Sequence, residues 1–108
     1  GFYMAYTKIN ISGISARVQR ASSAAQAKLC ERVLTDSAEY VPYRTGKLCS
    51  SGKVGEKSVS WTAEYARECY YAERTFSKKA HPKATARWFE AAKSANIAVW
   101  ENEIKRMI

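Results

Sequence analysis

An apolar repeat at intervals of three and four residues dominates the last quarter of the chain. Its members are Ala84, Trp88, Ala91, Ala92, Ala95 and Val99, continued by Trp100, Ile104 and Met107. This spacing places the apolar side chains on one face of an α-helix. Pro82 suits the first turn of such a helix because it has no amide hydrogen to leave unpaired. The sequence therefore predicts a long helix over 83–106.

A second helical repeat occupies the first half of the chain. Its apolar members are Val18, Ala25, Leu29 and Val33, continued one position later by Leu34, Ala38 and Val41. Pro42 disfavours helical geometry at the residue before it, so the helix is expected to end there. We predict an amphipathic helix over 18–41.

The remaining segments suit strands and turns. Residues 1–17 contain a short apolar alternation, which favours an extended arm or a brief strand. Val59 and Trp61 alternate with serine and threonine, so we predict a strand over 58–62. Residues 65–72 fit either a second strand or a helical turn.

A glycine-rich stretch over 43–57 predicts a mobile loop with at most one short strand, near 47–51. A polar, basic loop is expected over 74–82. Two long helices around a small antiparallel sheet define a single α+β domain over 1–108, with loop and sheet in 42–73.

The net charge of +8 is unevenly distributed. Residues 1–28 carry four basic residues and no acid, and residues 74–93 carry six basic residues against Glu90 alone. Because positive potential speeds encounter with acidic partners, we predict an interface in the second patch. Its candidate residues are Arg74, Lys78, Lys79, Lys83 and Arg87. A solvated loop, an acidic protein surface and a nucleic-acid backbone remain alternatives for this patch.

Cysteine and histidine are too sparse to predict a reactive or metal site. The three cysteines, Cys30, Cys49 and Cys69, form no closely spaced pair, and His81 is the only histidine. Buried free thiols are a better interpretation than a zinc site of these four residues or a hydrolase built on Cys49 or His81. No glycine-rich phosphate loop is present. We therefore predict no catalytic residue, no cofactor and no metal.

Hydropathy argues against a membrane protein. No stretch approaches the roughly 18 consecutive apolar residues that a membrane-spanning helix requires. The N-terminal residues lack the basic and apolar regions of a signal peptide, so we expect a soluble chain made in the cytosol.

Three short runs resemble a known family when they are taken in order. They are V-P-Y-R-T-G-K-L-C-S-S over 41–51, Y-A-R-E-C-Y-Y over 65–71, and H-P-K-A-T-A-R-W-F-E-A-A-K over 81–93. This series resembles the small minor capsid proteins of tailed bacteriophages and prophages, which belong with the tail-completion, or head-tail joining, proteins.

The resemblance implies a structural viral protein with no catalytic step. It implies a long helix, a small antiparallel sheet with a flexible loop, and a C-terminal helix. It also implies a homo-oligomeric ring, commonly hexameric, at the neck of the virion. The expected partners are a head connector or stopper protein, a tail tube or tail terminator protein, and packaged DNA through non-specific contact. No membrane is expected, and synthesis would occur in the cytoplasm of the bacterial host.

The resemblance also assigns positions. The turn that enters the loop would hold Pro42, Thr45, Gly46 and Leu48, with Ser51 on its near side. The sheet would hold Tyr65, Ala66, Tyr70 and Tyr71. The last helix would be seated by Pro82, Ala84, Trp88, Phe89 and Ala92. Cys49 and Cys69 depart from the pattern, where polar residues are usual.

The rival hypothesis is a basic nucleic-acid-binding module. The same lysines and arginines would contact phosphates, and the tyrosines would stack on bases. Tryptophans at helical spacing are more typical of a packed core than of such a stacking surface.

Overall fold

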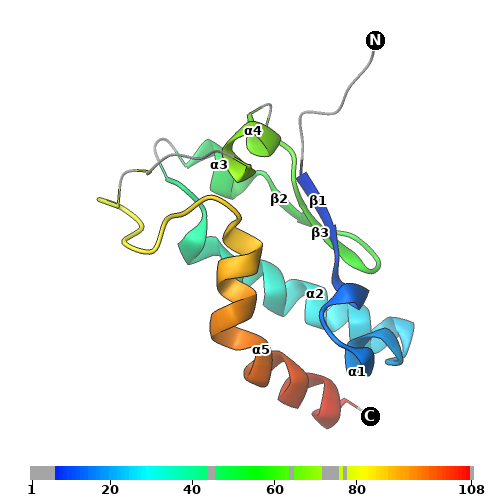
Figure 1. The fold of residues 1–108 in the computed structure, drawn as a ribbon. Coiled ribbons are helices and arrows are strands. Elements are labelled where there is room, and N and C mark those ends of the chain that lie inside the picture. The colour runs from blue at the N-terminus through cyan, green and yellow to red at the C-terminus, as the bar shows by residue number, and fades with distance from the viewer. Residues whose placement is uncertain (1–6, 44–45, 64, 72–75, 77, 108) are drawn as a thin grey trace.

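The computed structural model describes residues 7–43, 46–63, 65–71, 76 and 78–107, and the structural statements below refer to them. The elements are β1 (Thr7–Asn10), the 3-10 turn η1 (Ile11–Gly13), α1 (Ala16–Gln19), α2 (Ser23–Ser37), the 3-10 turn η2 (Ala38–Tyr40), α3 (Lys47–Ser50), β2 (Gly52–Val54), β3 (Ser58–Trp61), α4 (Ala66–Tyr70) and α5 (Trp88–Arg106). Two long helices and a small sheet form the body of the molecule (Figure 1). The predicted α+β class and the small antiparallel sheet are confirmed.

The three strands form an antiparallel sheet in the order β1–β3–β2. Thr7 and Gly52 both lie opposite Trp61, one on each side, so these three residues share one face of the sheet. Helix α2 covers this face. A Cβ added at Gly52 would come within 2.9 Å of the Leu34 side chain and 3.2 Å of the Trp61 indole nitrogen, so α2 packs closely against β2 at this glycine.

The first long helix begins later than the apolar repeat predicts. Val18 lies in the separate short helix α1, and α2 starts after a turn. Two serines explain the break, because each caps a new helix. The Ser15 hydroxyl accepts from the Val18 amide at 3.2 Å, and the Ser22 hydroxyl accepts from the Ala25 amide at 3.1 Å. Near its other end the helix runs on into η2, which ends one residue before the predicted boundary.

The segment between the long helices requires two corrections. The strand expected at 47–51 is wrong, because Gly46, with φ of +85°, starts the helical turn α3 and the strand β2 follows it. The sheet assignment of Tyr65, Ala66, Tyr70 and Tyr71 is also wrong, because these residues form α4 and its two flanks. The helical alternative for 65–72 is therefore confirmed over 65–71, and residue 72 lies outside the described residues. The strand over 58–62 is also confirmed and is β3. The mobility of the glycine-rich loop stays a prediction.

Helix α5 ends where predicted but begins at Trp88 instead of residue 83. Arg87 has φ of +50°, a left-handed conformation that does not belong to a right-handed α-helix. The helix can therefore begin only after Arg87. Pro82 and Ala84 consequently lie in the loop before the helix and do not form its first turn.

The core is aromatic. Trp61, Trp88 and Trp100 are fully buried. The Trp88 ring meets those of Trp61 and Tyr70 edge-on, at centroid distances of 5.6 and 4.7 Å. Such edge-to-face pairs add to the burial of apolar area. The prediction of buried thiols is confirmed for Cys30 and Cys69, whereas Cys49 is only half-buried.

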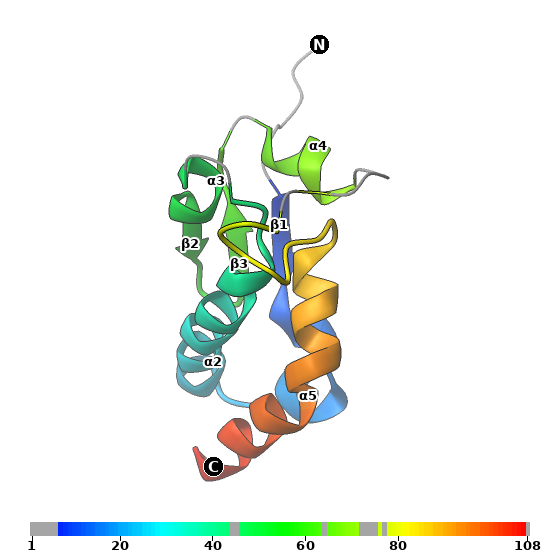
Figure 2. The same ribbon diagram turned by 90° about the vertical axis from the view of Figure 1, so that its left-hand side faces the viewer.

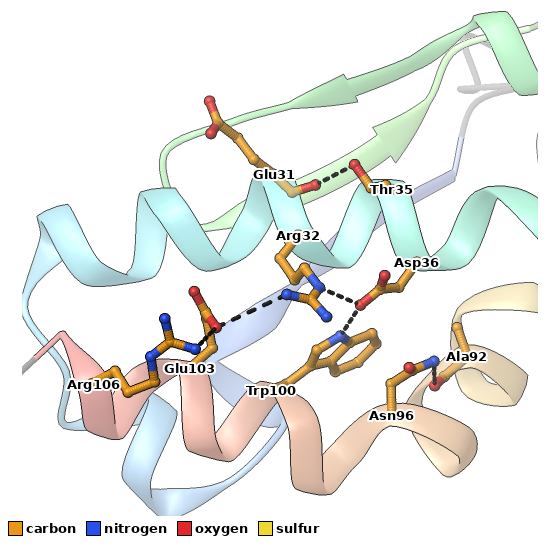
Figure 3. A network of polar contacts seen from close by, with 9 residues as sticks. All are labelled: Glu31, Arg32, Thr35, Asp36, Ala92, Asn96, Trp100, Glu103 and Arg106. Atoms are coloured by element: carbon orange, nitrogen blue, oxygen red, sulfur yellow. Dashed lines mark hydrogen bonds and ion pairs between the residues drawn. The ribbon is translucent and has the colours of Figure 1, made fainter.

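A polar clasp joins α2 to α5 (Figure 3). The indole nitrogen of Trp100 donates to the Asp36 carboxylate at 2.7 Å, and the same oxygen accepts from Arg32 at 2.9 Å. Glu103 lies 3.9 Å from Arg32 and 3.5 Å from Arg106. The clasp thus satisfies the only polar atom of a buried tryptophan, which would otherwise lose its hydrogen bond to water.

The long helices give the molecule two distinct ends. The start of α5 lies with α3 and α4 at one end, and the C-terminus lies at the other (Figures 1 and 2). Among the described residues, no helix is both long and apolar enough to cross a membrane.

Candidate assembly surface

The loop over 78–87 is tied to two other parts of the chain. The Thr85 amide donates to the Tyr40 carbonyl oxygen at 3.0 Å, and the Arg87 amide donates to the Tyr70 carbonyl oxygen at 2.8 Å. Nδ1 of His81 lies 2.8 Å from the carbonyl oxygen of Val41. The loop is therefore positioned against the end of α2 on one side and against α4 on the other.

Four of the five predicted interface residues lie on this loop, and Arg74 lies outside the described residues. The Lys78 ammonium donates to the Ala84 carbonyl oxygen at 3.0 Å. Lys83 lies 3.5 Å from Glu39 and over the Tyr40 ring. Both partners of the Lys83–Glu39 pair are more than half exposed, so the pair contributes little to stability. The structure thus brings the basic residues together while engaging part of their charge locally.

Exposed tyrosines accompany these basic residues, and of these Tyr43 has no signal in the charge pattern of the sequence. Tyr43 is 39% exposed and Tyr71 is 53% exposed. The Tyr43 ring lies 4.9 Å from the His81 ring, and the Arg87 guanidinium lies 5.3 Å from the centre of the Tyr71 ring. The family resemblance predicts both Tyr70 and Tyr71 in the sheet. In the structure Tyr70 ends α4 with its side chain buried, and Tyr71, directly after the helix, points in a different direction and is exposed.

We call this region the tyrosine–cation surface; it consists of Tyr40, Tyr43, Tyr71, His81, Lys83 and Arg87. All of its members belong to the 78–87 loop or to segments that the loop contacts. Its loop leads into the start of α5, at the opposite end of that helix from the C-terminus (Figure 2). Tyrosine and arginine are the residue types that dominate the energetic centres of protein interfaces.

Arg87, a member of this surface, has a strained backbone conformation. It is the only non-glycine residue with positive φ in the described part of the chain. For a residue with a Cβ this conformation costs about 1–2 kcal/mol. The cost is offset by the Tyr70 hydrogen bond and by the contact of the guanidinium with Tyr71.

The family-motif residues are mostly structural. Pro42, Leu48, Trp88 and Phe89 are buried, and the Ser51 hydroxyl donates to the Leu48 carbonyl oxygen at 2.7 Å. Pro82 is exposed, and Thr45 lies outside the described residues. Most motif residues therefore specify turns and core contacts, whereas Tyr71 is a motif residue that lies on the surface.

Burial makes two of the three thiols poor nucleophiles. Desolvation raises the pKa of Cys30 to about 11 and also raises the pKa of Cys49. Little of either thiol is ionised near neutral pH, and the thiolate is the reactive form. Burial raises the pKa of Tyr70 as well. In the described part of the chain, no group of three His, Cys, Asp or Glu side chains is placed to hold a metal ion.

An α+β domain that presents aromatic and basic side chains at one end is typical of a small protein that works through contacts with other macromolecules. The sequence matches the family described as minor capsid protein over residues 5–108, so the chain belongs to the minor capsid protein family. The chain is thus a bacteriophage structural protein and a component of the virion. No curated protein and no solved structure matched it.

Proposed function

We propose that the protein completes the neck of a tailed phage particle by forming a homo-oligomeric ring, commonly hexameric in the joining proteins it resembles. The ring docks between a head connector or stopper protein and a tail tube or tail terminator protein. It acts by binding, without a catalytic step. Membership of the minor capsid protein family supports a structural role in the virion.

The tyrosine–cation surface carries this proposal. Tyr71 and Arg87 supply large, partly exposed area for contact with another protein. The surrounding loop is already held by hydrogen bonds to Tyr40 and Tyr70. Docking then costs little conformational entropy, because a loop that is ordered beforehand has less freedom to lose.

The glycine-rich segment over 46–57 is the proposed contact between neighbouring copies in the ring. It contains α3 and the edge strand β2, and Val54 on that strand is 39% exposed. Contacts repeated around a closed ring reinforce one another, so each one can be individually weak.

The direct test is a nonsense mutation in the gene, made in the phage or prophage that encodes it. We expect DNA-filled heads and separate tails to accumulate, because the step that joins them is missing. Adding the purified protein to this extract should restore joined particles, counted by electron microscopy. Normal particle yield without the protein would overturn the proposal, and so would empty, unpackaged shells.

A pair of variants locates the docking surface. Tyr71→Ala combined with Arg87→Gly should lose the ability to restore joining, because both central contacts are removed while glycine accepts the left-handed backbone. Val99→Ala combined with Lys105→Ala alters exposed residues on α5 and should restore joining normally. Equal loss of activity in both double variants would contradict the assignment of this surface.

The rival hypothesis is a nucleic-acid-binding module built on the 78–87 loop. It requires tight DNA binding with a steep salt dependence through that loop, and it differs from the proposed function in requiring that the protein be absent from assembled particles. The local engagement of Lys78 and Lys83 argues against it, because cations already bonded within the protein bind phosphate less readily.

A further inference from the structure

The sheet has one covered face and one open face. Thr7, Val59 and Trp61 point to the covered face, where they are buried near α2 and the Trp88 ring. Because side chains alternate along a strand, the intervening residues point to the opposite face. These residues are Lys8 and Asn10 on β1, Ser58 and Ser60 on β3, and Lys53 on β2.

The register aligns two lysines across this open face. Lys8 and Lys53 both lie opposite Ser60, one on each side of the central strand. Neighbouring strands are about 4.8 Å apart, so the two lysine backbones lie about 10 Å apart. The half-buried Ser60 forms the floor between the two long, exposed lysine side chains, whereas Ser58 is buried. We call this arrangement the lysine trough; it consists of Lys8, Lys53 and Ser60.

The charge of the trough is not neutralised by the described residues. Arg17, Arg32, Lys83 and Arg106 each form an ion pair with a carboxylate, whereas Lys8 and Lys53 form none within the described part of the chain. None of the three strands contains an acidic residue. The acid closest to them in sequence, Glu56, lies in the β2–β3 turn beside Lys57.

We propose that the lysine trough binds the phosphate backbone of duplex DNA without reading its sequence. Ammonium and hydroxyl groups both donate hydrogen bonds to phosphate oxygens, and such contacts carry no sequence information. Among the strand residues that the structure describes, none on the open face is aromatic, so these residues do not stack on the bases of a single strand. None of them is apolar either, and protein interfaces need an apolar centre, which favours a phosphate chain over an acidic protein.

The trough is separate from the tyrosine–cation surface, since no residue belongs to both. In the ring of the proposed function, on which this biological setting rests, the trough would line the passage of the packaged DNA. One surface then holds the protein in the particle, and the other contacts the molecule that passes through it.

The test measures binding of a random-sequence DNA duplex by fluorescence anisotropy at several low salt concentrations. The slope of log K against log salt reports the number of phosphate contacts, at about 0.9 per contact. Lys8→Gln combined with Lys53→Gln should make this slope shallower by about 2. Lys28→Gln combined with Lys105→Gln is the matched control, because it removes the same charge from exposed lysines that form no ion pair with any described residue. The control should retain the slope of the unaltered protein.

Three results would overturn the inference. They are no DNA binding by the unaltered protein, an equal loss of slope in the control, and stronger binding of poly-glutamate than of DNA through the same two lysines. Thermal unfolding of each variant shows whether any loss comes from misfolding. Head-tail joining by the Lys8→Gln, Lys53→Gln variant is a separate measurement. If the unaltered protein bound DNA through the trough but failed to join heads to tails, the proposed function would fall and this inference would stand.

Discussion

The two long helices begin in opposite ways. Helix α2 starts with a local signal, because the Ser22 hydroxyl accepts a hydrogen bond from the amide of Ala25. Helix α5 has no side-chain cap, and it starts at a left-handed Arg87 whose amide bonds to Tyr70. The first start is encoded by four adjacent residues, and the second depends on packing against distant ones. The second is also the start that lies within the tyrosine–cation surface.

The largest expected effect comes from the residue that anchors the start of α5. Trp88→Ala removes a fully buried indole that contacts Trp61 and Tyr70, so we expect the free energy of unfolding to fall by about 3–5 kcal/mol. Val99→Ala, on the exposed side of the same helix, should cost less than about 0.5 kcal/mol. Guanidinium unfolding curves measure both. A loss below about 1 kcal/mol for Trp88→Ala would show that distant packing does not set this start.

The next largest effect is expected from the polar contacts between α2 and α5, in which Asp36 accepts from Trp100 and Arg32. Asp36→Ala leaves the buried Trp100 nitrogen without an acceptor, and the free energy of unfolding should fall by about 1–3 kcal/mol. Glu31→Ala removes a carboxylate from the exposed side of α2 and should have little effect. Equal values from urea unfolding would mean that the clasp contributes no more than surface charge does.

Arg87 allows a sharper comparison within one position. Arg87→Gly and Arg87→Ala both lose the contact with Tyr71, but only alanine retains a Cβ in the left-handed conformation. The glycine variant should therefore be more stable than the alanine variant by about 1 kcal/mol. An alanine variant of equal or greater stability, measured by thermal unfolding, would mean that this backbone carries no strain.

The local start of α2 should respond to a single cap. Ser22→Ala should lower the free energy of unfolding by about 1 kcal/mol, because one amide of the first turn loses its acceptor. Ser23→Ala changes the next serine, which is exposed within the helix, and should be nearly neutral. If the two substitutions had the same effect in chemical unfolding, the helix would not be capped by Ser22.

The contrast between a locally encoded helix start and one set by distant packing also explains which features the sequence could predict. The apolar repeats identified both long helices and the end of α5, because burial of one face determines these features, whereas α2 ends at Ser37 and only the 3-10 turn η2 continues to Tyr40. The break before α2 was also encoded in the sequence, since Ser15 and Ser22 each cap a helix, but the apolar spacing that continues through Val18 obscured it. The start of α5 had no local signal, since Arg87 is held by a hydrogen bond to the Tyr70 carbonyl oxygen.

The candidate site was predicted only in part, for a related reason. Charge clustering along the chain located Lys78, Lys83 and Arg87, which the structure places on one loop. Exposure of Tyr43 and Tyr71 depends on how α4 and the 78–87 loop pack, and composition does not encode this packing. The alignment of Lys8 with Lys53 depends on strand register, which became known only with the sheet.

Localisation in the particle tests the central claim most directly. A gold-binding tag at the C-terminus, which lies at the opposite end of α5 from the loop of the tyrosine–cation surface, would mark the protein in purified virions viewed by electron microscopy. We predict gold confined to the junction between head and tail. Gold spread over the head shell, or virions without any gold, would contradict a role in joining the two.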